Sequence, residues 1–342
     1  LPRVATYRPL ELGERTDLCV GFFISGMESL RTRIYIDGYN LYFGCLKGTP
    51  YKWLNPVSLS EKLLTRSGAP NSKLDPLAVK FFTAEISQRA AADSNSLNDQ
   101  RAYHLALKLH LGDRLETFKG SYSIDKTKFP KVEYGNDGRE LEPRASERIK
   151  IWKMEEKQSD VHLALEAVYD AMMEPELEQV VFVTNDTDFV PALKKIREYN
   201  KLNRHRQIQI GVVIPIKRYE DYRKPNNSLS TLSDWTIHFI DECELAQSQM
   251  PCRVRGARKS AIRPFSWFKH PEEIEKIISI LSDKTLEASP AKAWKWLEKP
   301  LYPSEDLENI NGLPCDQLDN KDSLKIILQH VQAYAAYKRS RL

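Results

Sequence analysis

The sequence lacks several features that would place it in a well-defined class of protein. Its 342 residues include only five cysteines, at positions 19, 45, 243, 252 and 315, and no two of them have the spacing of metal ligands. This scatter argues against a disulfide-stapled secreted domain and against a cysteine-based zinc site, so we expect free thiols and a cytoplasmic protein. No apolar run reaches the roughly 18 residues that a membrane-spanning helix needs. We therefore expect no membrane partner.

A strong charge of one sign is also missing. The 51 basic and 47 acidic residues leave a net charge of only +4, so any attraction to a polyanion has to come from local patches. The composition is otherwise that of a globular protein, and the length allows two domains. The first methionine is Met27, and we expect residues 1–26 to be a poorly ordered N-terminal extension outside the folded domains.

From Arg33 onward, short apolar runs alternate with segments whose apolar residues have helical spacing. The strand-like runs cover residues 33–37, 77–86, 114–122, 179–186, 207–215 and 236–240. Alternation of strands and helices is typical of a parallel sheet covered by helices. The sequence therefore predicts an α/β fold with a mainly parallel sheet.

The remaining segments define the expected domain organisation. Residues 123–148 are polar, charged and rich in turn residues, and we interpret them as an insertion that projects from the sheet. Residues 246–264 lose the apolar periodicity and gain basic residues, which predicts a basic linker. Residues 265–342 contain three apolar stripes at helical spacing and predict a small all-α C-terminal domain. The larger domain then spans residues 27–245.

Four aspartates stand where strands end or helices begin. Asp37 and Asp186 end apolar strands, Asp188 follows in the same loop as Asp186, and Asp160 opens a helix. Because functional groups collect at the carboxyl ends of parallel strands, we expect these carboxylates to lie together. Carboxylates so gathered repel one another unless a cation neutralises them, and oxygen ligands suit Mg²⁺ or Mn²⁺.

Each acid alone also has an ordinary structural interpretation. Asp160 and Asp188 occupy positions at which carboxylates commonly cap helices or interact favourably with the first turn. Asp37 and Asp186 are harder to explain in this way, because a carboxylate at the end of a buried strand gains nothing from packing. Their joint placement therefore favours a functional site.

Three segments carry a family resemblance. "YIDGYNLY", "EEKQSDVHLAL" and "VFVTNDTDFVPALKKIRE", in this order, resemble the acidic motifs of the NYN domain family, a branch of the PIN-like metal-dependent nucleases, and residues 31–242 resemble its bacterial subgroup. The resemblance implies a three-layer α/β/α domain. It matches the following residues to family positions: Asp37, Asp160, Asp186 and Asp188 to acidic metal-binding positions, Asn40 to an asparagine, Thr184 to a small hydroxyl residue, and Asn185 and Gln158 to positions where glycine is common.

The resemblance implies a Mg²⁺- or Mn²⁺-dependent endoribonuclease whose products carry 5′-phosphate and 3′-hydroxyl ends. In this interpretation the four aspartates hold the metal, Asn40 holds Asp37 or a metal-bound water in place, and Thr184 and Asn185 support the loop. Metal-free cleavage of RNA would instead require a general acid and base, usually histidine, and no histidine belongs to the metal-binding positions. His162 alternates with apolar residues, and we interpret it as a helix-face residue.

Two other functions remain open at this stage. One is a non-catalytic RNA-binding module, because residues 194–206 and 253–270 are basic and the latter add Phe265, Trp267 and Phe268, which could stack on bases. A solvated helix face and a linker explain the same stretches equally well. The other is a phosphatase of the haloacid-dehalogenase type, because "DTDFV" at 186–190 fits its nucleophile motif. That motif normally follows the first strand of its domain, whereas here it comes late.

The C-terminal segment has a second resemblance. A tryptophan–leucine helix end, an "NGLP" turn and a terminal amphipathic helix resemble the toxin-binding domain of Xre/MbcA/ParS-type antitoxins. An unrelated helical module with Trp294, Trp296 and Leu297 in its core explains these features equally well. The resemblance implies that residues 265–342 mediate binding of a protein partner or self-association.

Overall fold

A computed structural model describes residues 29–66, 71–91, 93–218, 225–283, 286, 289–301 and 305–341. The extension expected over residues 1–26 lies outside this part of the chain. The described strands are β1 (Leu30–Asp37), β2 (Ser72–Ala84), β3 (Leu115–Pro130), β4 (Arg148–Lys157), β5 (Gln179–Val183), β6 (Gln209–Val213), β7 (Trp235–Ile237), β8 (Arg253–Val254) and β9 (Ala261–Ile262). The α-helices are α1 (Gly38–Leu41), α2 (Pro56–Leu64), α3 (Ser96–Leu111), α4 (Ser159–Met173), α5 (Val190–Leu202), α6 (Asn227–Leu232), α7 (Glu242–Gln247), α8 (Pro271–Leu281), α9 (Pro290–Leu297) and α10 (Lys321–Arg339).

The sheet order creates a switch point beside β1. The seven strands lie in the order β4-β3-β2-β1-β5-β6-β7, and all neighbours are parallel except β3 and β4. The chain therefore builds outward from β1 in one direction and then returns to β5 on its other side. In open α/β sheets, ligands bind outside the carboxyl ends of the strands at such a point. The topology directs attention to the ends of β1 and β5.

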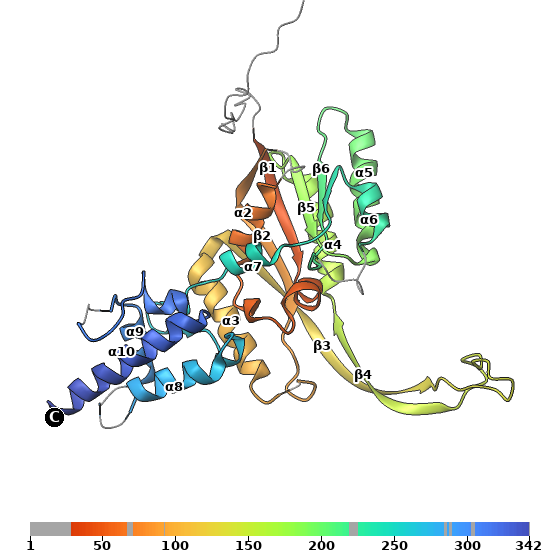
Figure 1. The fold of residues 1–342 in the computed structure, drawn as a ribbon. Coiled ribbons are helices and arrows are strands. Elements are labelled where there is room, and N and C mark those ends of the chain that lie inside the picture. Colours follow the sequence, from red (N-terminus) through yellow and green to blue (C-terminus); the bar gives the residue numbers. More distant parts are fainter. Residues whose placement is uncertain are drawn as a thin grey trace, which may run out of the picture.

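Helices cover both faces of the sheet, with α2 and α3 on one side and α4 and α5 on the other (Figure 1). Alternation along β1 explains the two cores: Ile34 and Ile36 pack with the α2–α3 side, whereas Tyr35 packs with the α4–α5 side. All three side chains are buried. The prediction of a three-layer α/β/α domain with a mainly parallel sheet is confirmed.

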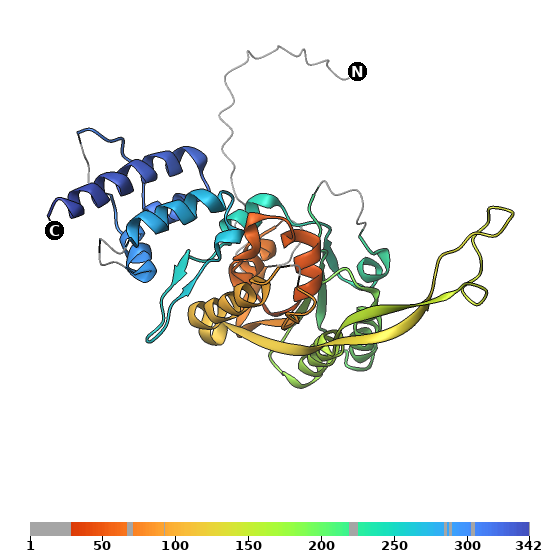
Figure 2. The same ribbon diagram turned by 90° about the horizontal axis from the view of Figure 1, so that it is seen from below.

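The segment predicted as an insertion forms the outer part of one strand of a β-ribbon and the tip that joins it to the other strand. β3 continues to Pro130 and pairs antiparallel with β4 through ten residue pairs, from Ser121↔Lys157 to Pro130↔Arg148. The prediction ended the strand at Tyr122 and gave none at 148–157. The ribbon does project from the sheet, as expected, and it extends far from the domain in both views (Figures 1 and 2).

The C-terminal helices form a separate core. α8, α9 and α10 pack around buried Trp294, Leu297 and Ile327, so this tryptophan and leucine have a structural role. The segment expected to be a linker contains β8 and β9, which form a small antiparallel sheet with buried Arg253 and Val254. The exact domain boundaries remain a prediction.

Two further sequence predictions concern helices and thiols. Among the residues that the structure describes, no helix combines the length and the apolar character needed to cross a membrane. The four cysteines within the described ranges, Cys45, Cys243, Cys252 and Cys315, keep their thiols and form no disulfide, as expected.

Candidate metal centre

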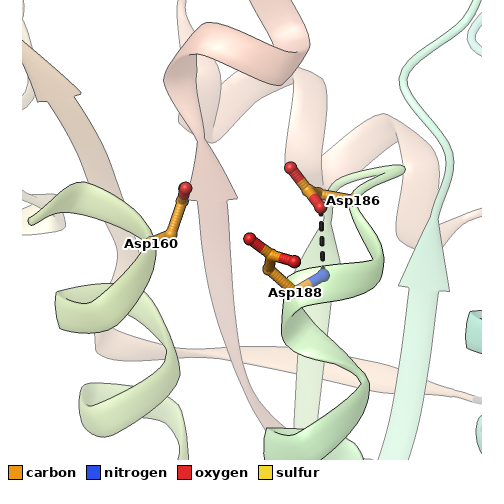
Figure 3. Close-up of side chains that lie close together, drawn as sticks. All are labelled: Asp160, Asp186 and Asp188. Atoms are coloured by element: carbon orange, nitrogen blue, oxygen red, sulfur yellow. Dashed lines mark hydrogen bonds between the residues drawn. The ribbon is translucent and has the colours of Figure 1, made fainter. Parts of the chain in front are cut away.

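Three of the predicted carboxylates converge at the switch point. Asp160 comes from the start of α4, Asp186 from the loop after β5, and Asp188 from the short 3-10 helix Thr187–Phe189 that leads into α5. One carboxylate oxygen from each residue lies within 4.8 Å of the other two. Figure 3 shows the three side chains facing a common space. The strand order thus brings together residues up to 28 positions apart in the sequence.

Local hydrogen bonds explain the shape of the Asp186 loop. The Asp186 carboxylate accepts a hydrogen bond of 3.0 Å from the backbone N–H of Asp188, which is a helix N-cap interaction. The Thr184 hydroxyl in turn accepts one of 3.1 Å from the Asp186 N–H. Because Asp186 uses one oxygen as a cap, the turn fixes both carboxylates of the pair. Asn185 is held as well, since its side-chain oxygen accepts from the Asn226 N–H at 2.8 Å.

Asp37 lies beside this group and is not a member of it. Its side chain is only 6% exposed, and each of its oxygens already accepts a hydrogen bond. Oδ1 accepts from the Asn40 N–H at 2.9 Å, and Oδ2 accepts from the Thr184 hydroxyl at 3.1 Å. The Asn40 side-chain oxygen accepts from the Asn185 N–H at 3.2 Å. Thr184 and Asn40 therefore join the end of β1 to the Asp186 loop.

The electrostatics of the site disfavour negative charge. Burial is the main cause that raises the pKa of Asp37 to about 7; the nearby Asp160 and Asp186 also raise it, whereas the hydrogen bonds from Asn40 and Thr184 lower it. Burial also raises the pKa of Asp160 to about 6, together with repulsion from Glu156, Asp186 and Asp188. The structure records no ion pair between these aspartates and a cationic side chain within the described ranges. The cluster is consequently short of positive charge.

A strained residue precedes Asp160. Gln158 has φ 82° and ψ −23°, and it alone among the described non-glycine residues has a positive φ. The left-handed conformation costs an L-residue roughly 1–2 kcal/mol, because Cβ approaches the following carbonyl oxygen. This explains physically why glycine suits the position. The left-handed conformation of Gln158 turns the chain from β4 into α4, and this turn places Asp160 at the site.

Replacement of Gln158 by glycine is expected to stabilise the protein. Relief of the strain gains roughly 1–2 kcal/mol, whereas the added freedom of glycine in the unfolded chain costs about 0.4–1 kcal/mol. The net gain of roughly 0.5–1 kcal/mol should appear as a higher midpoint of thermal unfolding. Gln158→Ala is the matched control, because alanine removes the side chain but keeps Cβ. Equal stabilisation by both substitutions would contradict the strain argument.

One acidic neighbour was not predicted. Glu156, near the end of β4, accepts a hydrogen bond of 3.2 Å from the Ser159 N–H and another from the Ser159 hydroxyl. It is also among the residues that raise the pKa of Asp160. The available signal was its position four residues before Asp160, but β4 itself had not been recognised. His162 packs edge-on against Phe118, in line with the helix-face interpretation.

The donor set suits a hard divalent cation. The three converging ligands are all carboxylates, which match the oxygen preference of Mg²⁺ and Mn²⁺, whereas many redox-active iron sites use two histidines and one carboxylate. The spacing allows one ion to be held by these oxygens directly or through water. The residues therefore fit a metal site, while the identity of the metal stays a prediction.

The fold and the acidic site agree with the sequence comparisons. The model of the NYN domain matches residues 31–203, and the chain belongs to this family. The chain is also 38% identical over 320 residues to the protein named 6-hydroxy-3-succinoylpyridine 3-monooxygenase HspA of Pseudomonas putida (strain DSM 28022 / S16), covering 90% of this chain and 96% of that one. No solved structure matches the chain. The family match ends before the C-terminal helices, so their antitoxin-like resemblance stays a prediction.

The structure also bears on the alternatives. Asp186 follows β5 rather than the first strand, so the phosphatase motif is not in its required place. Phe268 is buried and stacks on Trp294, and Trp267 packs against Trp53. These contacts give Phe268 and Trp267 a structural role and favour the structural interpretation of this stretch, whereas binding of nucleic acid there stays a prediction. Two of their basic neighbours are paired, since Arg253 bonds Glu298 at 2.7 Å and Arg263 bonds Asp319 at 2.8 Å.

Proposed function

We propose that the protein is a metal-dependent ribonuclease that hydrolyses RNA phosphodiesters at the Asp160–Asp186–Asp188 cluster. The observation that carries this proposal is the convergence of three carboxylates, within 4.8 Å of one another, at the switch point of an NYN domain. Uncompensated carboxylates repel one another, so the arrangement gains stability when a cation binds. A divalent cation there would polarise a phosphate and lower the pKa of a water molecule that attacks phosphorus.

The chain's own residues have distinct parts in this proposal. Asp160, Asp186 and Asp188 hold the cation, and Asp186 is kept in place by its hydrogen bond to the Asp188 N–H. Asp37 keeps a second lone pair free on each oxygen and can orient a water molecule next to the cluster. Asn40 and Thr184 fix the carboxylate of Asp37, because each of them holds one side of it.

A second candidate function comes from the similarity to the protein named as a monooxygenase. The two sequences are 38% identical over 90% of this chain, which is similar enough for the two proteins to share an activity. Hydroxylation of a pyridine consumes O₂ and two electrons from a reductant, so it requires redox chemistry that an all-carboxylate cluster does not favour. We therefore place it second. The assay for it uses 6-hydroxy-3-succinoylpyridine with O₂ and a reduced nicotinamide as electron donor.

One experiment compares the two functions directly. Purified protein is incubated with end-labelled single-stranded RNA or DNA in Mn²⁺, Mg²⁺ or EDTA, and in parallel with the pyridine mixture. The ribonuclease proposal predicts internal cuts in RNA that depend on the metal and leave 5′-phosphate ends, with no oxidation of the nicotinamide. Oxidation of the nicotinamide that depends on the pyridine, together with intact RNA, would overturn it in favour of the monooxygenase.

A further inference from the structure

The β3–β4 ribbon has two chemically different faces. Residues directly opposite each other in an antiparallel pair point to the same side, so the register assigns every side chain to a face. The basic face consists of Tyr122, Ile124, Lys126, Lys128 and Pro130 of β3 and of Arg148, Lys150, Trp152, Met154 and Glu156 of β4. The opposite face consists of Ser121, Ser123, Asp125, Thr127 and Phe129 and of Ile149, Ile151, Lys153, Glu155 and Lys157.

Positive charge is concentrated on the outer half of the basic face. Its four cations, Lys126, Lys128, Arg148 and Lys150, are all exposed, and no carboxylate lies among the residue pairs from 124 to 130 on this face. The structure records no ion pair between these cations and a described acid. On the opposite face Lys153 is paired with Glu155, and Asp125 faces it across the strands. The opposite face also carries Lys157, but its two lysines are balanced by Asp125 and Glu155, so only the basic face has a net positive charge.

An exposed tryptophan lies among these cations. Trp152 is 51% exposed, although it is the largest apolar side chain of the ribbon. The Lys126 ammonium lies 4.8 Å from the centre of its ring, and the Arg89 guanidinium, from the loop after β2, lies 5.6 Å away. An aromatic surface flanked by cations is the combination that binds single-stranded nucleic acid, because bases stack on the ring while phosphates meet the charges.

The basic face leads to the carboxylate cluster. β3 runs parallel to β2, so the ribbon leaves the sheet at the carboxyl edge where the cluster lies (Figure 1). At the base of this face, Glu156 bonds Ser159 and raises the pKa of the adjacent Asp160. Tyr39, two residues after Asp37, lies near both Glu156 and Tyr122: burial is the main cause that raises its pKa, and these two residues raise it further. The nine residues from Arg148 to Glu156 span about 27 Å of strand, which is room for several nucleotides.

We propose that the basic face of the β3–β4 ribbon binds single-stranded RNA and guides it into the carboxylate cluster, with Trp152 as a stacking platform. We choose a nucleic acid as the ligand because its phosphates complement the positive charge of the basic face and because this face is continuous with the carboxylate cluster. The choice of RNA over DNA rests on the proposed function, because the ribbon itself presents charge and an aromatic surface that both polymers can use. The ribbon then acts on substrate affinity and not on the chemical step.

The test uses the full-length chain and two matched pairs of variants. Trp152→Ala on the basic face is paired with Ile151→Ala on the opposite face, and Lys150→Glu is paired with Lys153→Glu in the same way. All four positions lie on the exposed ribbon, outside the two cores of the domain. Binding of a labelled 20-nucleotide single-stranded RNA is measured by fluorescence anisotropy in EDTA, and cleavage is measured in Mn²⁺.

We expect Trp152→Ala to weaken RNA binding about tenfold, and to raise KM with little change in kcat. Lys150→Glu should weaken binding and lower the slope of log Kd against log salt by about 0.7 or more. Ile151→Ala and Lys153→Glu should change RNA affinity less than twofold.

Three results would overturn the proposal. The first is unchanged RNA affinity in both basic-face variants, or a loss of affinity in the opposite-face variants that is as large as in the basic-face variants. The second is a change in oligomeric state in Trp152→Ala with normal RNA binding, which would make the ribbon a protein contact. The third is equal binding of a DNA of the same sequence with the same dependence on Trp152, which would overturn the assignment of RNA as the ligand of the ribbon. Absence of cleavage by the wild-type protein would instead contradict the proposed function, and the binding measurement in EDTA keeps that failure separate.

Discussion

Asp186→Asn is expected to reduce metal-dependent RNA cleavage at least about 1000-fold while the protein remains folded. The asparagine oxygen can still accept the hydrogen bond from the Asp188 N–H, because asparagine caps helices as well as aspartate does. The loop therefore keeps its shape and loses one negative charge. A cation held by three carboxylates loses a ligand, and a loss of about 4 kcal/mol in transition-state stabilisation corresponds to a 1000-fold lower rate.

The control for this prediction is Asp113→Asn, which makes the same chemical change at an exposed aspartate in the short helix after α3. It should leave cleavage within a factor of two of the wild-type rate. Single-turnover rates in Mn²⁺ and a titration of the metal concentration separate a weaker cation site from a slower chemical step. If Asp186→Asn cleaved RNA as fast as Asp113→Asn at saturating metal, the catalytic site would have to lie elsewhere.

The location of residues that follow the carboxyl ends of parallel strands could be predicted from the sequence. Apolar runs before Asp37 and Asp186 predicted strands, and the rule for parallel sheets then placed both residues at one edge. The structure agrees, because β1 and β5 are neighbours at the switch point. What the sequence did not reveal is the difference between them: Asp186 converges with two other acids, whereas Asp37 is buried behind hydrogen bonds from Asn40 and Thr184.

The ribbon was missed for a physical reason. Prediction of strands depends on one buried face, which produces alternation of apolar and polar residues. In the outer ribbon neither face is buried, so "SIDKTKFP" carries charges on both sides and reads as a loop. Charges that pair over long distances in the sequence were equally hard to predict. Arg253 and Arg263 seemed free in a basic linker, but their partners Glu298 and Asp319 lie 45 and 56 residues away.

Replacement of Asp37 by asparagine is expected to stabilise the metal-free protein at pH 8 and to lose that advantage at pH 4. Burial is the main cause that raises the pKa of Asp37 from its ordinary 3.8 to about 7 in the folded state. Between these values the folded state binds more protons than the unfolded state, so stability falls as pH rises from about 4 to about 7. The difference corresponds to about 4 kcal/mol in the wild-type protein above pH 7.

Asparagine removes the buried charge and with it this pH-dependent loss, at the cost of a poorer hydrogen bond to Thr184 that is worth about 1 kcal/mol. The gain at pH 8 should therefore be about 2–3 kcal/mol, measured as thermal midpoints in EDTA from pH 4 to pH 8. Asp113→Asn serves again as the control and should follow the wild-type curve. Saturating Mg²⁺ should reduce the difference in thermal midpoint between the variant and the wild-type protein, because a bound cation stabilises the ionised cluster of the wild-type protein. A variant destabilised equally at every pH would mean that Asp37 carries its charge in the fold without penalty.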